Sequence, residues 1–206
     1  MKINSRYAIV IILLSSLLPI ITSGVSIIYG PDHPTGISVN PPDSHERMSD
    51  NVLLIILDGL PAYVMDDPQY MPSLANWTEH GAKLNVTTSE ITLTGACTKE
   101  MSTGRHSTPV DALRNWEVKY EGDDDAWHYA VDEGMSVAFT GFYVWNNLFP
   151  DSRFIHETVY DSGFSDVYDA DDKIIGIVNR WVEQDEHDLM IAHLGGTDHA
   201  GHIYGI

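Results

Sequence analysis

Three short apolar segments, each stopped by glycine, constrain the fold of this chain more than any other feature. They cover residues 51–57, 135–140 and 188–194, and they end in Asp58-Gly59, Gly141 and Gly195-Gly196. Short apolar runs bounded by turn-forming residues predict β-strands with little exposed surface. The first run is continuous, so we expect residues 51–57 to form a central parallel strand that is buried on both faces.

Two segments between these runs have the pattern of helices. Residues 72–80 begin with proline and are followed by Gly81, an arrangement typical of helix ends. Residues 171–184 begin with acidic residues and place Ile174, Val178, Trp181 and Val182 on one face at helical spacing. Because strands and helices alternate, residues 51–206 are expected to form an α/β domain with a mostly parallel central sheet.

The chain in front of the first strand predicts a membrane anchor and a linker. Residues 7–29 carry no charge and follow Lys2 and Arg6. At about 1.5 Å per residue this run can cross a hydrocarbon layer of about 30 Å, so residues 1–29 are expected to be an uncleaved, single transmembrane helix. A cleaved signal peptide and a buried core helix are the alternatives. Residues 30–50 are rich in Pro, Gly, Ser and Asp and are expected to be a linker.

The distribution of charge predicts both the orientation of the anchor and the class of partner. Basic residues precede the apolar run and acids follow it, which places the N-terminus in the cytoplasm and the domain on the extracytoplasmic or luminal side. The whole chain has 11 Lys and Arg against 30 Asp and Glu, a net charge of −19. Such a chain is not a general nucleic-acid binder, because phosphate backbones need a basic surface. Cations are the natural partners.

The single cysteine excludes an internal disulfide and a cysteine-built zinc site. Ten histidines beside many carboxylates leave room for a metal site with nitrogen and oxygen ligands.

Polar residues follow two of the apolar runs at the point where each predicted strand ends. Asp58 follows the first run directly, and Asp198 and His202 lie just after the third. Ligands of open α/β sheets bind beyond the carboxyl ends of the strands, so these residues are expected to converge. On a helix, the spacing of Asp198 and His202 places a carboxylate and an imidazole on one side, where they can bind one divalent cation.

Each of these residues also has a simpler interpretation. Asp58 followed by glycine is a common turn former, and Asp198 with His202 could be a helix-capping carboxylate and a surface histidine. His199 would point away from these two on a helix and is a weaker ligand candidate. Three more histidines are expected to be structural or surface residues: His106, His187 and His193.

A hydroxyl-rich segment, residues 89–99, contains the candidate nucleophiles. Thr94 is our choice because it precedes Gly95 and a helix-like stretch that ends near Thr103-Gly104. A helix N-terminus stabilises negative charge, such as that of an alkoxide or a phosphate. A threonine hydroxyl is a weak nucleophile unless a metal lowers its pKa and orients it.

The residues alone do not separate Thr94 from Thr92 and Thr98. These threonines could also form a strand edge and cap a helix. Cys97 is less suited to nucleophilic attack, because Lys99 is its only apparent basic neighbour.

Three motifs together resemble the alkaline-phosphatase superfamily, within its type I phosphodiesterase/nucleotide pyrophosphatase branch. They are the apolar run ending in Asp58-Gly59, Thr94 with Thr103-Gly104 downstream, and Asp198-x-x-Gly201-His202. Residues 134–150, which include Trp-x-x-Leu-Phe-Pro, and residues 188–202 are similar to segments of the GPI ethanolamine-phosphate transferases. The resemblance covers about residues 51–206.

This resemblance implies a sheet with helices on both faces and a site for two divalent metals, typically zinc. Asp58 and Thr94 would bind one metal, with Thr94 also the catalytic nucleophile, and Asp198 and His202 would bind the second. The family has further ligands downstream, whereas this chain stops at Ile206. We therefore expect an N-terminal fragment whose sheet is incomplete at its C-terminal side, with about half of a site and no activity of its own.

The activity implied by the resemblance is a phosphotransferase that moves phosphoethanolamine from a phospholipid to a glycan hydroxyl through a phospho-threonine intermediate. A phosphodiesterase or nucleotide pyrophosphatase of the same superfamily, in which water takes the group, is one alternative. The other is an inactive acidic surface domain that binds cations or partners.

Overall fold

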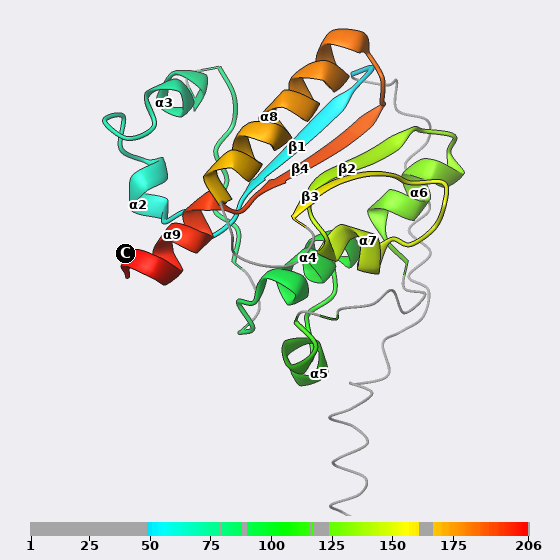
Figure 1. Ribbon diagram of the computed structural model, residues 1–206, viewed down its shortest axis with the longest axis horizontal. Helices are drawn as coiled ribbons and strands as arrows, with labels where there is room; N and C mark the ends of the chain where they lie inside the picture. Colours follow the sequence, from blue (N-terminus) through cyan, green and yellow to red (C-terminus); the bar gives the residue numbers. More distant parts are fainter. Residues whose placement is uncertain are drawn as a thin grey trace, which may run out of the picture.

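The computed structural model describes residues 49–78, 80–87, 90–115, 117, 124–160 and 167–205. Its centre is a sheet of four parallel strands in the order β1-β4-β2-β3 (Figure 1). The strands are β1 (Val52–Leu57), β2 (Val137–Phe142), β3 (Ile155–Tyr160) and β4 (Leu189–Leu194). The α/β class and the parallel sheet are therefore confirmed, and the carboxyl ends of all four strands lie at one edge of the sheet.

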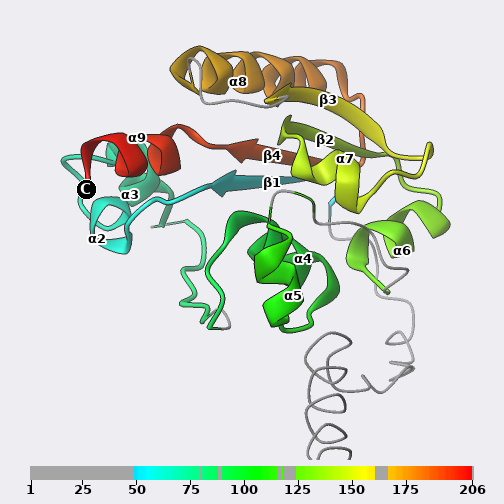
Figure 2. The same cartoon turned by 60° about the horizontal axis from the view of Figure 1, so that its bottom comes forward.

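Helices cover both faces of this sheet (Figure 2). The long helix α8 lies on one face, against β2 and β4, while α6 packs against β2 from the opposite face, beside α4. In chain order the helices are α2 (Ala62–Met65), α3 (Pro72–Thr78), α4 (Thr94–Thr103), α5 (Pro109–Leu113), α6 (Ala126–Asp132), α7 (Val144–Leu148), α8 (Val167–Gln184) and α9 (Gly196–Tyr204). The expected helices on both faces are present.

The alternation of side chains along β2 gives the two faces separate apolar layers. Phe139 points to the side of α6 and α7, where its ring stacks on Trp145 with centroids 5.0 Å apart. The preceding Ala138 points to the opposite side and packs with Trp181 of α8 and Met190 of β4. Both tryptophans are fully buried, and rings of this size dominate the energetics of a core.

One expectation about the sheet is wrong: residues 51–57 do not form a central strand buried on both faces. β1 lies at the outer edge of the described sheet and pairs only with β4. Ile55, in the middle of the strand, is 53% exposed. An apolar run shows that a strand can be buried, but its position in the sheet depends on which distant strands pair with it.

The predicted elements differ from the observed ones mainly at their ends. The strand predicted at 135–140 continues through Gly141 to Phe142, with an irregular register there. The helix predicted at 171–184 begins at Val167; Ile174 and Trp181 are buried as expected, but Val182 is 54% exposed. The helix predicted at 72–80 ends at Thr78.

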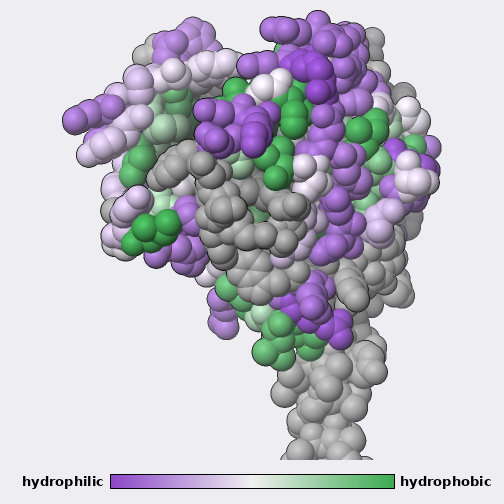
Figure 3. All heavy atoms as spheres, in the orientation of Figure 1, coloured by the Kyte–Doolittle hydropathy of each residue, from purple (hydrophilic) through white to green (hydrophobic). Residues whose placement is uncertain are grey.

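The predicted anchor, residues 1–29, and most of the predicted linker, residues 30–50, lie outside the described residues. None of the helices in the described part of the chain is both long and apolar enough to cross a membrane. Hydrophilic residues predominate on the face shown in Figure 3, with small groups of apolar residues between them.

Candidate active site

The central contact of the site joins the end of β1 to the start of α4. Asp58 directly follows β1, and Thr94 is the first residue of α4. The hydroxyl Oγ1 of Thr94 donates a hydrogen bond to Oδ2 of Asp58 over 3.1 Å. The residue before the helix, Leu93, offers no side-chain cap. The Thr94 hydroxyl thus donates to the carboxylate of Asp58 and does not cap the helix.

The structure also distinguishes Thr92, Thr94 and Thr98, which the sequence alone did not. Thr98 is buried, and its hydroxyl donates to the backbone carbonyl of Thr94 within α4. Thr92 is exposed and lies ahead of the helix. Of the three, Thr94 is the one bonded to Asp58. Cys97 donates its thiol to the carbonyl of Ile91, and burial raises the pKa of this thiol, which disfavours the reactive thiolate.

The ends of β1 and β4 are joined by backbone contacts that bring Asp58 and Asp198 together. The N–H of Asp58 donates to the carbonyl of Leu194 over 3.0 Å, and the Thr197 hydroxyl donates to the carbonyl of Asp58. Gly59 has a φ of +66°, and a β-carbon added to it would lie 2.6 Å from Cα of Asp198. Glycine is required here because any side chain would displace α9.

A carboxylate from α8 fixes the turn between β4 and α9. Asp171 accepts hydrogen bonds from the backbone N–H groups of Gly195 (3.1 Å) and Gly196 (3.0 Å). A β-carbon on Gly196 would lie 2.4 Å from Oδ2 of Asp171. Hydrogen bonds that a carboxylate accepts from N–H groups at a helix start are strong, so Asp171 helps to set the position of Asp198 in the first turn of α9.

Asp198 and His202 face one another along α9, as their spacing predicts. Nε2 of His202 lies 3.5 Å from Oδ2 of Asp198. The imidazole is exposed, whereas the carboxylate is half-buried. The structure therefore places Asp58 beside Thr94 and Asp198 beside His202. The backbones of these two pairs meet where Gly59 contacts Asp198.

The two carboxylates of this rim have opposite pKa shifts. Burial raises the pKa of Asp58, but His193, the Thr94 hydroxyl and the N–H of Gly59 together bring this pKa below its ordinary value. The pKa of Asp198 is raised, first by burial and then by the negative charge of Asp58. Two carboxylates that repel one another form a place where a cation would be stabilising.

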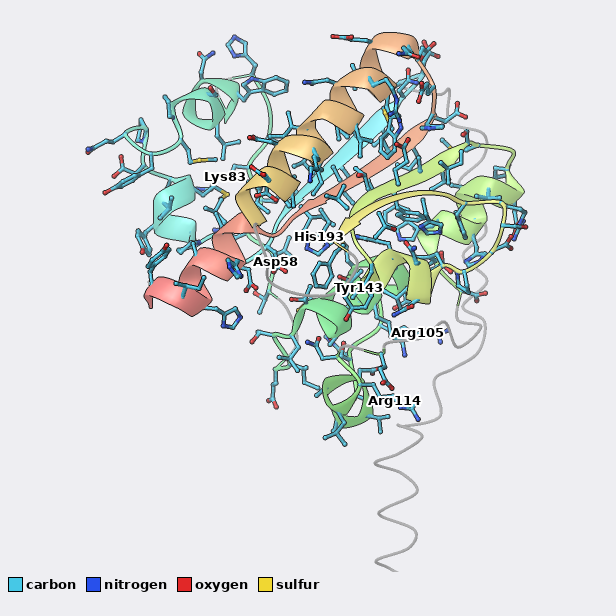
Figure 4. All side chains as sticks on the ribbon, viewed as in Figure 1. Asp58, Lys83, Arg105, Arg114, Tyr143 and His193 are labelled. Carbon is cyan, nitrogen blue, oxygen red and sulfur yellow. The ribbon has the colours of Figure 1, made fainter. Side chains whose placement is uncertain are left out.

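His193 is a functional candidate that the sequence interpretation missed. It was expected to be a structural or surface histidine, but it is buried in β4 with Nε2 3.4 Å from Oδ2 of Asp58 (Figure 4). On its other side, the indole N–H of Trp145 donates to its Nδ1 over 3.3 Å. A histidine within an otherwise apolar strand was the available signal, because a buried imidazole needs polar partners.

The predicted metal ligands occur as two pairs: Asp58 with Thr94, and Asp198 with His202. Their oxygen and nitrogen atoms are donors that suit a divalent ion such as zinc. Within the described ranges, no three His, Cys, Asp or Glu side chains converge on one point. If two ions bind here, the described residues would supply only part of the coordination of each.

Comparisons with known proteins agree with the transferase resemblance at low identity. No family model matches the chain. The human protein named GPI ethanolamine phosphate transferase 2, catalytic subunit, is 24% identical over 180 residues, which are 85% of this chain and 18% of that protein. GPI ethanolamine phosphate transferase 2 of Schizosaccharomyces pombe is 26% identical over 183 residues, or 83% of this chain and 24% of its own length.

A mouse relative, GPI ethanolamine phosphate transferase 3, catalytic subunit, is 28% identical over 109 residues, 52% of this chain and 10% of that protein. The chain spans less than a quarter of the length of these three curated relatives. Over most of its residues, the chain is thus similar to a segment of GPI ethanolamine phosphate transferases.

Proposed function

We propose that this chain supplies the nucleophile of a phosphotransferase that moves phosphoethanolamine from a phospholipid to a glycan hydroxyl. The observation that carries the proposal is the hydrogen bond from Thr94 to Asp58 at the carboxyl edge of the sheet. Thr94 is also the first residue of a ten-residue helix, where negative charge on a phosphoryl group is stabilised. The names of the relatives support the choice of group and acceptor.

In the first step, Oγ1 of Thr94 attacks the phosphorus of a lipid such as phosphatidylethanolamine. The bond from Oγ1 to phosphorus forms while the bond from phosphorus to the glycerol oxygen breaks. Asp58 holds the hydroxyl proton before attack and is placed to receive it. The glycerol oxygen leaves on the opposite side of phosphorus and takes a proton from water, which is replaced when Asp58 releases its own proton to solvent, so that diacylglycerol leaves as a neutral alcohol and phosphoethanolamine remains on Thr94.

In the second step, a glycan hydroxyl attacks the same phosphorus. Its oxygen forms the new bond to phosphorus while the bond to Oγ1 of Thr94 breaks. The glycan hydroxyl loses its proton to solvent, and Oγ1 takes a proton from solvent through Asp58, which restores Thr94. In this proposal Asp58 accepts the proton of Oγ1 in the first step and returns a proton to Oγ1 in the second.

Two divalent ions, for which we propose zinc, would neutralise charge on the phosphoryl oxygens and lower the pKa of the Thr94 hydroxyl when bound. Asp58 and Thr94 would contribute to one of these sites, and Asp198 and His202 to the other. We further propose that residues 1–29 anchor the chain in a membrane with its domain on the luminal or extracytoplasmic side, beside its lipid donor.

The test is to trap the intermediate on Thr94. The protein is used as its gene encodes it, including any residues that follow Ile206, with zinc and phosphatidylethanolamine radiolabelled in the ethanolamine. Acid quenching followed by peptide mapping should find one phosphoethanolamine group on Thr94. Thr94→Val should abolish the label, whereas Thr94→Ser should retain part of it. Thr92→Val is the matched control, because Thr92 is exposed and should leave labelling unchanged.

The fate of the label distinguishes the alternatives. Transfer to an added glycan, with little release as free phosphoethanolamine, supports a transferase. Release into water at the same rate with and without the glycan would instead identify a phosphodiesterase. Absence of label on Thr94, in protein that binds zinc and is folded, would overturn the proposed function.

A further inference from the structure

His193 is a buried titratable residue for which the reaction steps above have no use. It lies in β4, opposite Ile56 of β1 in the parallel register, and its side chain is 3% exposed. Its two ring nitrogens face different partners: Nδ1 faces the indole N–H of Trp145 at 3.3 Å, and Nε2 faces Oδ2 of Asp58 at 3.4 Å. The imidazole therefore lies between Trp145 of the aromatic core and the carboxylate of Asp58, which contacts the candidate nucleophile Thr94.

The partner on one side determines which nitrogen carries the proton. A tryptophan indole is a donor only, so Nδ1 of His193 must accept and be unprotonated. In the neutral ring the proton is then on Nε2, the atom that faces Asp58. Within the described part of the chain, Nε2 makes no hydrogen bond: it lies 3.4 Å from Oδ2 of Asp58 but is not aligned with it, and catalytic hydrogen bonds are often long or poorly aligned before ligands bind.

Two donors from different elements converge on the same oxygen of Asp58. Thr94 Oγ1 approaches Oδ2 from α4, and His193 Nε2 approaches it from β4. The Thr94 hydrogen bond and an aligned His193 contact would together oppose rotation of the carboxylate, because a turn about its last bond would remove Oδ2 from both groups.

The surroundings of His193 leave it little freedom to move. The ring of Phe142 lies 5.8 Å away, and that of Trp145 lies 6.2 Å away in an edge-to-face arrangement. Gly141 of β2 has a φ of +112°, and a β-carbon there would lie 2.1 Å from the carbonyl oxygen of His193. Polar contacts are stronger in such a water-poor, aromatic environment than at the surface.

We propose that His193 is a positioning residue, locked by Trp145 in the Nε2–H form, that holds Asp58 in the orientation required by Thr94. The proposal rests on the proposed function for its catalytic consequence. The tautomer of His193, on which the positioning role depends, can be measured without any reaction.

The first test is the tautomer of His193 in the unmodified chain. The full chain, labelled with nitrogen-15 in histidine and held in detergent micelles without metal, should show His193 with Nε2 protonated and Nδ1 unprotonated. The His193→Gln spectrum assigns the signal. Trp145→Phe, which keeps a buried ring but removes the indole N–H, should convert this signal to a mixture of both tautomers. Protonation at Nδ1 in the unmodified chain would overturn the proposal.

The second test compares donors of different kind at position 193. His193→Gln keeps an N–H donor near the place of Nε2, whereas His193→Phe keeps only the ring. We expect His193→Phe to slow labelling of Thr94 at saturating phosphatidylethanolamine and to weaken zinc binding, each by about 10–100-fold, the usual effect of losing a group that orients a ligand. His193→Gln should restore most of both, with the KM for the lipid unchanged.

His156 provides the matched control. It is a half-buried histidine of β3 whose ring stacks on Phe139, and its contact is with the carbonyl of Phe149. His156→Phe should lower stability without changing the labelling rate or the zinc affinity. Equal labelling by the unmodified chain and His193→Phe would refute the positioning role. If the unmodified protein never labels Thr94, the proposed function fails, while the tautomer and zinc measurements still decide the role of His193.

Discussion

Gly59 and Asp198 are in backbone contact, so close that a β-carbon on Gly59 would lie 2.6 Å from Cα of Asp198. This contact ties the turn after β1 to the first turn of α9. Because Asp58 precedes that glycine, the separation of the two acidic residues is set by the backbone and not by flexible side chains.

Replacing Gly59 tests this contact. Gly59→Ala places a side chain against backbone that cannot move aside and forces alanine into a left-handed conformation. We expect a loss of roughly 2–4 kcal/mol in the free energy of unfolding, measured by urea denaturation. Gly104→Ala is the matched control: Gly104 has nearly the same φ, +67°, but nothing within 4 Å of an added β-carbon. It should lose only about 1 kcal/mol.

Removal of the Asp171 carboxylate should loosen α9. Asp171→Ala leaves the N–H groups of Gly195 and Gly196 without this acceptor, at a cost of roughly 1–3 kcal/mol. Faster hydrogen exchange in α9 than in β4 would show that the loss is local. Asp172→Ala, at an exposed neighbouring position of α8, should change neither. A uniform increase in exchange throughout the domain would contradict this assignment.

The contact between Lys99 and Asp111 should make the free energy of unfolding depend on pH. Burial raises the pKa of Asp111, but the Thr108 N–H and Lys99 bring it below its ordinary value. A carboxyl whose folded pKa is lowered stabilises the protein above its unfolded pKa of about 3.9 and loses that contribution as the pH falls further. Asp111→Asn should therefore lose roughly 1–3 kcal/mol at neutral pH, with a smaller difference below about pH 4.

An exposed pair serves as the control for that experiment. Lys83 and Asp66 also form a salt bridge, but their side chains are 42% and 51% exposed. Asp66→Asn should change stability by less than about 1 kcal/mol at any pH, because exposed pairs contribute little. A pH dependence equal to that of Asp111→Asn would mean that burial does not distinguish the two pairs.

Zinc should stabilise the domain through the acidic rim. At a zinc concentration about 100 times the dissociation constant, the unfolding free energy should rise by about 2.7 kcal/mol, as followed by thermal unfolding. Asp58→Asn and Asp198→Asn should each reduce this increase, and a chelator should reverse it. Asp172→Asn should respond to zinc like the unmodified chain. An equal response in all three variants would mean that zinc binds elsewhere.

Local patterns predicted the main elements of this fold. The runs that became β1, β2 and β4 are apolar and end in turn-forming residues, and the apolar face of α8 was visible at Ile174 and Trp181. The edge position of β1 was not predictable in this way, because it is fixed by pairing with β4. β3 was missed because its polar residues, among them His156 and Glu157, interrupt the apolar pattern.

The sequence likewise predicted only part of the candidate site. The strand ends indicated that Asp58 and Asp198 would approach one another. The choice of Thr94 over Thr98 needed the helical register of α4, which buries the Thr98 hydroxyl against a carbonyl. The place of His193 required Trp145, a residue 48 positions earlier in the chain. Such a contact exists only after the core has packed.

The strand order also has a consequence for how the molecule assembles. Thr197 and Asp58 are in contact although they are 139 positions apart along the chain. As the polypeptide leaves the ribosome, β1 emerges before the other three described strands and its neighbour β4 emerges after them, so the pairing of β1 with β4 must wait until β4 has been synthesised. Pairing over such distances is slow, and until it occurs an apolar strand is open to aggregation.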